Sequence, residues 1–411
     1  MPTTNFGRRS TPPQRALRAE LRAAITVGAG VTVALNFGKL PPALAELRAA
    51  FGFTLVEVSW LTSLLMFAGA TLGIAGGSLA DRFGHRRTML VGLTLVGGAG
   101  LIGAFADRPA LMFASRIVES LGMLLTVLPG PALLSRCVPP ERLRGWLGGW
   151  SAYMPLGMSV MLIVTPWLIA SFGWRSAWVL TSICALLWVL LILRAHPSDA
   201  AESARSQGPG VSLLNLMALT LRSPGPWLLA VGFLFYAAQF LGAFSFLPTV
   251  YRESGIDPRL GGALTAIAVL GNALGNFASG HLLQRGIPRS TLLISAAGVI
   301  AIMAWVVYGS AAPFALRYSA ALTLSIVSGL VPGALFASVV AYAPDPRAVS
   351  TTVGWMQQGS GIGQALSLPT IAVIAQWHGD WSLTWVAIAG CALVVAMVGV
   401  AMRRFDARSA H

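Results

Sequence analysis

The stretch Gly77-Ser-Leu-Ala-Asp81-Arg82-Phe-Gly84-His-Arg86-Arg87 decides how this chain folds. It is a short charged segment, bracketed by glycines, between two long apolar runs at about 58–80 and 88–106. The hydrocarbon layer of a membrane offers no hydrogen-bond partners, so a segment this polar cannot lie within it. We therefore expect a tight loop on one face of a membrane, joining two membrane-spanning helices.

The composition is typical of a membrane protein with many spans. Of the 411 residues, 55% are hydrophobic and 10% are charged, and the mean hydropathy is +0.72. Soluble domains carry about 25% charged residues. A helix needs about 20 apolar residues to cross the hydrocarbon core. Apolar runs of about that length lie near 23–43, 58–80, 88–106, 110–135, 146–171, 176–194, 226–250, 260–283, 290–309, 314–342, 350–375 and 382–402. We expect an all-α polytopic protein of about twelve transmembrane helices.

Arginine is distributed unevenly between alternate loops. One set of loops holds Arg8, Arg9, Arg15, Arg18, Arg22, Arg82, Arg86, Arg87, Arg136, Arg142, Arg144, Arg194, Arg205, Arg222, Arg285, Arg289, Arg347, Arg403, Arg404 and Arg408. The opposite set holds Arg48, Arg108, Arg175, Arg252 and Arg259. Basic residues favour the cytoplasmic side, so both termini are expected in the cytoplasm, with the chain in a bacterial-type inner membrane. The net charge of +14 then reports topology, not a nucleic-acid surface.

The chain repeats itself with an offset of about 203 residues. Gly77 to Arg82 recurs as Gly280-His-Leu-Leu-Gln-Arg285, Pro129-Gly130 recurs as Pro332-Gly333, and Gly149-Trp150 recurs as Gly354-Trp355. Matches in one order at a nearly constant offset indicate a duplicated six-helix unit. The first span has a counterpart around Gln239, so we expect a retained helix and not a cleaved signal peptide.

The predicted organisation follows from the repeat: two pseudo-symmetric six-helix bundles at 23–194 and 225–402. Cytoplasmic segments at 1–22, 195–224 and 403–411 flank and join them.

The segment from Gly77 reads G-x-L-A-D-R-x-G-x-R-R, which resembles the signature loop between the second and third helices of major facilitator superfamily transporters. Two similar halves joined by a cytoplasmic linker are that family's architecture. The basic, proline-ended first helix is similar to that of cyanate and nitroimidazole transporters. The resemblance, from about residue 22 to 404, implies a monomeric secondary carrier that moves a small molecule by alternating access, coupled to protons. It implies neither an enzyme nor a cofactor.

The resemblance also implies that the signature loop closes the cytoplasmic side. Arg142 and Arg144, in the next cytoplasmic loop, are the expected partners of Asp81. The second copy has Gln284 where Asp81 stands, so any gate there lacks its acid. The alternative is that these charges only anchor the loop. The candidate gate residues are Gly77, Asp81, Arg82, Gly84, Arg86, Arg142 and Arg144.

Lys39 is the only lysine in the chain and lies late in the first span. An unpaired cation at the bilayer centre costs about 2.5–3.5 kcal/mol on insertion scales. Lys39 must therefore face a cavity, form an ion pair, or extend to the headgroups. It either lines the central cavity and attracts an anionic substrate, or snorkels to the outer surface.

Arg116 lies several residues inside the fourth span, and Glu119 follows on the same helical face. The Arg116-x5-Gly122 spacing resembles a family element whose arginine is linked to proton coupling. Burial raises a carboxyl pKa and a nearby cation lowers it. The pair is therefore either poised for protonation or a permanent structural ion pair.

Other polar residues in the apolar runs are candidates for lining a cavity. Helices one, four, seven and ten line the cavity in the family, which implies a substrate site made of Asn36, Lys39, Arg116, Gln239 and Arg317. Further in-membrane polar candidates are Tyr153, Tyr236, Asn272, Asn276, Gln357, Gln358 and Gln364.

Cations outnumber acids among these residues, so the sequence favours a small anionic substrate. One alternative is a proton-coupled drug efflux carrier. Another is a non-transporting receptor or sensor on the same fold, although the short tails and linker disfavour it. The chain has no P-loop, so ATP does not drive transport through it. Its five histidines are scattered, so we expect no metal site.

Overall fold

The computed structural model describes residues 12–53, 55–197, 212–247, 250–251 and 254–409, and these residues contain helices and connecting loops but no strand. Arg8, Arg9, Arg205 and Arg252 from the predicted loops lie outside the described residues, as do half of the N-terminal tail and about half of the linker. The helices of the first half are α1 Pro12–Gly38, α2 Leu40–Phe51, α3 Leu55–Phe83, α4 His85–Ala104, α5 Pro109–Val127, α6 Gly130–Cys137, α7 Pro140–Ser151, α8 Tyr153–Phe172 and α9 Arg175–Ala195.

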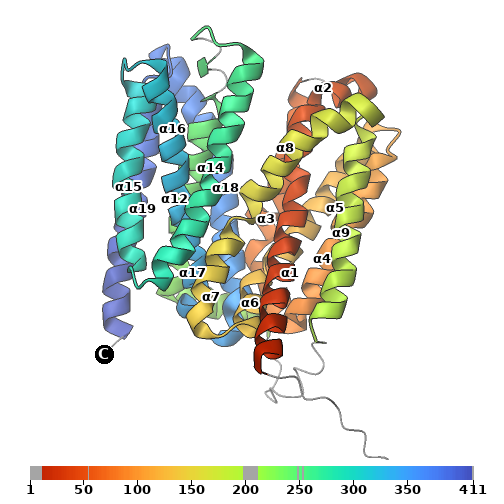
Figure 1. Ribbon diagram of the computed structural model, residues 1–411, viewed down its shortest axis with the longest axis vertical. Coiled ribbons are helices and arrows are strands. Elements are labelled where there is room, and N and C mark those ends of the chain that lie inside the picture. Colours follow the sequence, from red (N-terminus) through yellow and green to blue (C-terminus); the bar gives the residue numbers. More distant parts are fainter. Residues whose placement is uncertain (1–11, 54, 198–211, 248–249, 252–253, 410–411) are drawn as a thin grey trace, which may run out of the picture.

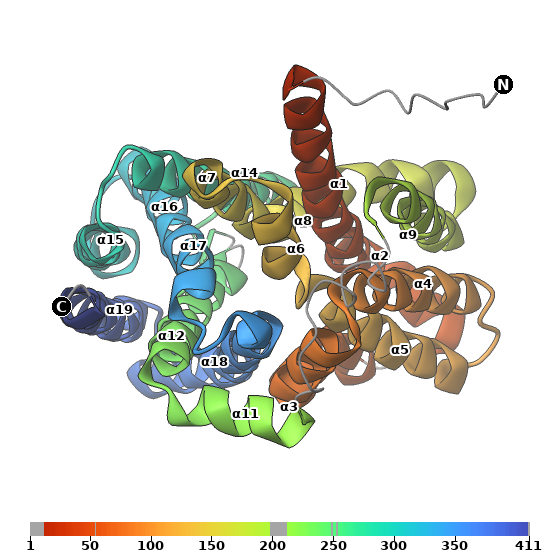
Figure 2. The same cartoon turned by 90° about the horizontal axis from the view of Figure 1, so that it is seen from below.

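The second half begins with α11, which runs along the surface between the two groups of long helices (Figure 2). Its elements are α11 Leu213–Arg222, α12 Pro224–Ser245, α14 Pro258–Gln284, α15 Arg289–Ala304, the π-helix η1 Trp305–Gly309, α16 Phe314–Ser328, α17 Leu330–Tyr342, the 3₁₀ turn η2 Pro346–Ala348, α18 Val349–His378 and α19 Thr384–Ser409.

The predicted polytopic all-α class is confirmed. Eleven of the described helical segments are long and apolar enough to cross a membrane, and each coincides with a predicted span. The remaining predicted span, at 350–375, lies in α18, which is long at 30 residues but carries many polar side chains. Because α18 packs between α3 and α12, protein surrounds much of its polar surface.

Several predicted spans are divided between two helices, and two of these divisions correspond in the two halves of the chain. The run at 110–135 is divided near Pro129, between α5 and α6, and the run at 314–342 is divided at Gly329, between α16 and α17. Proline lacks an N–H and cannot continue the hydrogen-bond ladder of a helix. The two breaks lie at corresponding places in the two halves, in keeping with the internal repeat.

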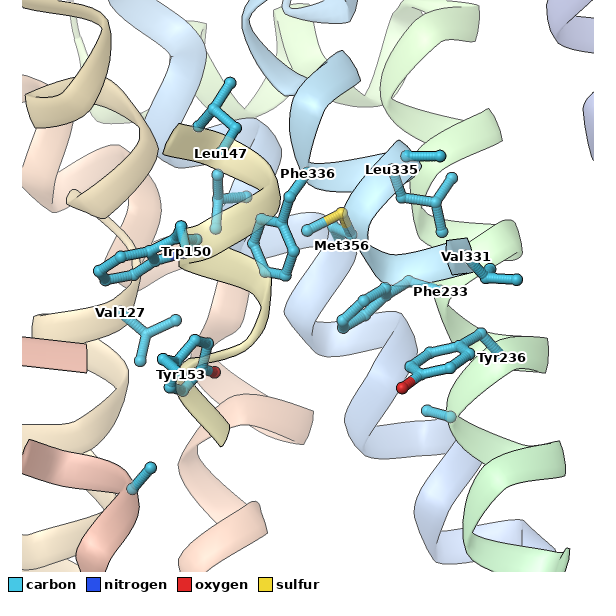
Figure 3. Close-up of a cluster of buried hydrophobic side chains, with 14 of the residues drawn as sticks. Val127, Leu147, Trp150, Tyr153, Phe233, Tyr236, Val331, Leu335, Phe336 and Met356 are labelled. Atoms are coloured by element: carbon cyan, nitrogen blue, oxygen red, sulfur yellow. The ribbon is translucent and has the colours of Figure 1, made fainter. Parts of the chain in front are cut away.

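The helices form two groups, α1–α9 and α12–α19, that meet at one end of the molecule (Figure 1). This end carries the loop from Gly77 to Arg87 and is called the signature-loop end below. The short helix α2 lies at the opposite end. Apolar side chains from both groups share one buried cluster (Figure 3), which includes Val127, Leu147, Trp150, Tyr153, Phe233, Tyr236, Val331, Leu335, Phe336 and Met356.

Glycines let the two groups approach closely at the signature-loop end. A Cβ atom on Gly77 would overlap the carbonyl oxygen of Ser350, and one on Gly354 would overlap that of Gly73. The backbones of α3 and α18 are therefore in direct contact. The repeat gives a second such contact, because Gly148 of α7 lies against the backbone of Gly280 in α14. Small residues at helix crossings allow this packing in membranes.

Candidate functional site

A buried charged cluster lies inside the first group of helices. Lys39, Arg116 and Glu119 are each 0% exposed. The Nζ of Lys39 donates to Oε1 of Glu119 at 2.9 Å, and Nη1 of Arg116 donates to Oε2 of the same carboxylate. One carboxylate thus serves two cations, and the cluster carries a net charge of +1 when all three groups are ionised.

Neighbouring polar groups take up the remaining donors of the cluster. Lys39 Nζ also donates to Oδ1 of Asn36 at 2.5 Å and to Oγ1 of Thr181 at 3.2 Å, which uses all three of its hydrogens. Arg116 Nη2 donates to the carbonyl of Asn36 at 3.3 Å. The ring of Trp178 lies 4.7 Å from Lys39 Nζ, within range of a cation–π contact. The residues come from the α1–α2 junction, α5 and α9.

This geometry excludes one of the two roles predicted for Lys39. Its side chain forms an ion pair and is fully enclosed, so it does not snorkel to the outer surface. The structure brings Asn36, Lys39, Arg116 and Glu119 together. Sequence reasoning missed Trp178 and Thr181. Trp178 ends the segment Gly173-Trp-Arg-Ser-Ala-Trp178, which has a counterpart in Gly379-Asp-Trp-Ser-Leu-Thr-Trp385.

Gln239 and Arg317 lie apart from this cluster. Arg317, near the start of α16, donates from Nε to the carbonyl of Val307 at 2.7 Å. Gln239 is 2% exposed on α12, and neither Nε2 nor Oε1 of its side chain has a hydrogen-bond partner among the described residues. A buried unpaired amide is costly, so it marks a place where a ligand or water would bind.

Uncharged polar side chains lie between the two groups of helices. Tyr153 and Tyr236 belong to the shared cluster of Figure 3 and come from opposite groups. The hydroxyl of Tyr236 donates to Oδ1 of Asn272 at 3.4 Å, and Nδ2 of Asn276 donates to the same oxygen at 2.9 Å. Across the interface, the backbone N–H of Ile74 donates to Gln358 Oε1 at 3.3 Å. These groups could hydrogen-bond a small solute.

Asp81 joins the two groups at the signature-loop end. Its carboxylate side chain is 0% exposed. It accepts the backbone N–H of Ser350 at 2.9 Å and that of Thr351 at 2.6 Å, together with the Thr351 hydroxyl at 2.7 Å. Ser350 and Thr351 begin α18, where N–H groups lack partners within the helix. The negative charge also complements the positive end of the helix dipole.

The expected arginine partners of Asp81 lie elsewhere. Arg142 pairs with Glu20 at 2.5 Å, and Arg144 Nη1 donates to the carbonyl of Leu283 at 3.5 Å. The prediction of Arg142 or Arg144 as its partner is therefore corrected. The Asp81 carboxylate instead contacts the N–H groups at the start of α18, which have no partner within that helix. It also contacts the ring of His85, whose Nε2 lies 3.0 Å away.

The other residues of the loop that are described below make contacts within the first half of the chain. Gly84 has a φ of 105°, which side chains rarely allow, and it turns the chain from α3 into α4. Arg82 lies over the ring of Phe83 at 5.6 Å, and Arg86 donates to the carbonyl of Leu193 at 3.0 Å.

The structure explains why the second copy of the loop lacks an acid. By the repeat, Gly145 and Trp146 correspond to Ser350 and Thr351. However, α7 already begins at Pro140, so residues 145 and 146 lie within it, where N–H groups bond four residues back. A carboxylate at position 284 would find no free N–H there. Gln284 instead donates from Nε2 to the carbonyl of Arg142 at 3.5 Å.

Comparison with known proteins agrees with this architecture. A family model described as the Major Facilitator Superfamily matches residues 26–367. A cyanate transport protein of Escherichia coli K12 is 26% identical over 239 residues, which are 57% of this chain and 59% of that protein. A 2-nitroimidazole transporter of the same organism is 23% identical over 383 residues, 91% of this chain and 93% of that protein.

A solved structure shares the fold. The crystal structure of FucP, a transporter of the same superfamily in the outward conformation, superposes with a TM-score of 0.76 at 14% identity. The superposition covers 93% of this chain and 98% of that one.

Proposed function

Because the chain belongs to the Major Facilitator Superfamily, a family of transporters and not of enzymes, we propose that it moves a small solute by alternating access. The contact that carries this proposal is the one between Asp81 and the start of α18, which joins the two halves at a single end. Hydrogen bonds and glycine packing can break and re-form, as a carrier cycle requires.

The signature-loop end is the cytoplasmic end in this proposal, since the arginine-rich loops gather there. Both termini are then cytoplasmic, and the chain lies in a bacterial-type inner membrane. It acts as a monomer, because both halves of the proposed site belong to one chain.

The substrate is proposed to bind between the halves, against Tyr236, Asn272 and the amide of Gln239, which has no hydrogen-bond partner among the described residues. Hydroxyl and amide groups can orient a small polar solute without fixing its charge. The preference for an anion rests on the Lys39, Arg116 and Glu119 cluster, whose net charge of +1 is surrounded by protein and poorly screened. Cyanate, the cargo named for one relative, is such an anion.

Glu119 is the proposed site of proton coupling. It is the shared acceptor of Lys39 and Arg116, so its protonation would weaken both contacts at once. All three side chains are enclosed in this conformation, so proton exchange with water requires the bundle to open. The alternative is a permanent structural ion cluster, which would leave transport independent of Glu119 protonation.

A second candidate is proton-coupled efflux of an apolar drug-like molecule. Aromatic rings of the second half favour it, since Phe233, Tyr236 and Phe336 belong to the cluster that both halves share. Phe233 and Phe336 meet edge to face with centroids 5.4 Å apart, and Tyr236 stacks on Phe240 at 6.0 Å. Such a surface accepts flat apolar molecules.

Uptake into proteoliposomes tests these proposals. The panel contains cyanate, formate and acetate as anions and 2-nitroimidazole as a neutral aromatic solute, each with and without a pH gradient. Saturable, gradient-driven accumulation of an anion supports the main proposal. Transport of 2-nitroimidazole alone supports the second candidate. If no anion is transported above protein-free liposomes, the anion proposal fails.

A further inference from the structure

A polar pocket lies at the signature-loop end, and none of the residues of the site proposed between the halves lines it. Its volume is about 140 Å³. Its walls come from α7, the end of α14 and the turn that follows it, the start of α15, α17 and the end of α19. The charged side chains that line it are Arg144, Arg289 and Asp406.

The pocket has more positive charge than its own carboxylate neutralises. Asp406 already accepts the hydroxyl of Tyr342 at 2.7 Å, and its other oxygen lies 3.4 Å from Nε of Arg289. The Nη atoms of Arg289 make no hydrogen bond to any residue that the structure describes. Arg144 makes one long bond, to the carbonyl of Leu283 at 3.5 Å. Two guanidinium groups thus retain unused donors beside one occupied acid.

The backbone adds a third feature that favours an anion. Helix α15 starts at Arg289, and the preceding residues Gly286, Ile287 and Pro288 line the same pocket. The first N–H groups of a helix have no partner within it, and the helix dipole makes that end positive. Phosphate groups commonly bind at such positions.

We propose that this pocket binds a phosphate group, held by Arg144, Arg289 and the start of α15. Guanidinium groups match the geometry of phosphate oxygens and bond them in pairs. Since one water occupies about 30 Å³ in the liquid, the pocket has room for several waters or for one phosphate. The phosphate is either that of an anionic lipid headgroup or that of a soluble ion.

The position of the pocket gives the bound phosphate a regulatory effect. Arg144 belongs to α7 in the first half of the chain, whereas Arg289 and Asp406 belong to the second half. A phosphate that bonds both arginines holds the halves together at this end and favours the conformation closed there. This effect rests on the alternating-access function proposed above, whereas binding itself does not.

Binding is tested on the purified full-length protein without any substrate. In detergent, inorganic phosphate is titrated while the midpoint of thermal unfolding is followed, with chloride at equal ionic strength as the reference. In parallel, unfolding is compared in nanodiscs of phosphatidylcholine alone and with added phosphatidylglycerol. Stabilisation by inorganic phosphate identifies a soluble ligand, and stabilisation by phosphatidylglycerol alone identifies a lipid headgroup.

The variants are Arg144→Gln and Arg289→Gln, with Arg285→Gln as the matched control on an exposed arginine of the same turn that does not line the pocket. A lost charged hydrogen bond should weaken the apparent phosphate affinity about tenfold or more. Asp406→Asn removes the competing acid and should strengthen it. Equal effects of Arg285→Gln and Arg289→Gln, or no stabilisation by either phosphate source, would overturn the proposal, whatever the transport assay shows.

Discussion

The carboxylate of Asp81 accepts the backbone N–H of Thr351, 270 positions away in the chain, at 2.6 Å. Together with the bonds from the Ser350 N–H and the Thr351 hydroxyl, this contact joins the end of α3 in the first half to the beginning of α18 in the second. It satisfies donors that α18 cannot satisfy itself. The contact depends on a carboxylate on one side and a helix start on the other, so it can be removed without disturbing either half alone.

Asp81→Ala should open the signature-loop end. Loss of a capping side chain costs about 0.5–2 kcal/mol, so the closed conformation should lose up to about 30-fold in population relative to the open one. Spin labels at the exposed positions Arg87 and Arg285 would report the separation of the halves by pulsed electron paramagnetic resonance. Asp107→Ala, which removes a 70% exposed acid, is the control. Unchanged distances in Asp81→Ala would argue that Asp81 only anchors the loop.

Gly354→Ala should have a similar effect through packing. The added methyl would overlap the carbonyl of Gly73, so α3 and α18 must move apart, at a cost of about 1–3 kcal/mol. Gly69→Ala adds the same methyl to α3 where nothing lies within 4 Å, and should leave the protein unchanged. For both variants, we would measure the distance between spin labels at the same two positions and the rate of transport. Equal behaviour of the two would contradict direct contact at Gly354.

Glu119→Gln should destabilise the protein strongly. It leaves Lys39 and Arg116 buried with no carboxylate, and breaking a buried pair costs about 3–5 kcal/mol. The midpoint of thermal unfolding in detergent measures the loss. The control is Glu20→Gln, since Glu20 pairs with Arg142 at the surface and should matter little.

The double variant Lys39→Met with Glu119→Gln separates stability from coupling. It leaves Arg116 as the one buried cation of the cluster, so part of the stability lost in Glu119→Gln should return. Any transport that remains should not depend on the pH gradient, because the proposed proton acceptor Glu119 is missing in this variant as it is in Glu119→Gln. Full proton dependence in this variant would exclude Glu119 as the coupling site.

Gln239→Leu should stabilise the protein and impair transport. The buried amide has no partner among the described residues, and an unsatisfied buried polar group costs about 1–3 kcal/mol. An apolar side chain removes that cost but also removes the groups proposed to bind the solute. Gln364→Leu is the control, since the Gln364 amide already donates to Ser360 at 3.0 Å. A stabilised variant with unchanged KM would exclude Gln239 from the substrate site.

The sequence alone was enough to predict the membrane-spanning helices and the all-α class. In a membrane, each span must be apolar over about 20 residues, so hydropathy marks the helices directly. The polar helix α18 shows the limit of this signal, because α3 and α12 pack against it and surround much of its polar surface. The loop at Gly77 was also recognisable, because its charges and glycines occupy neighbouring positions.

The partners of the charged residues were decided by the tertiary structure. Lys39 and Glu119 are 80 positions apart, and no local spacing places them in contact. The pairing of Asp81 with α18 depends on where that helix starts, and the missing acid at Gln284 depends on α7 starting earlier in its repeat. Hydrophobicity along the chain fixes which segments enter the membrane. Which buried charges then meet depends on how the helices pack, because burial penalises every charge that lacks a partner.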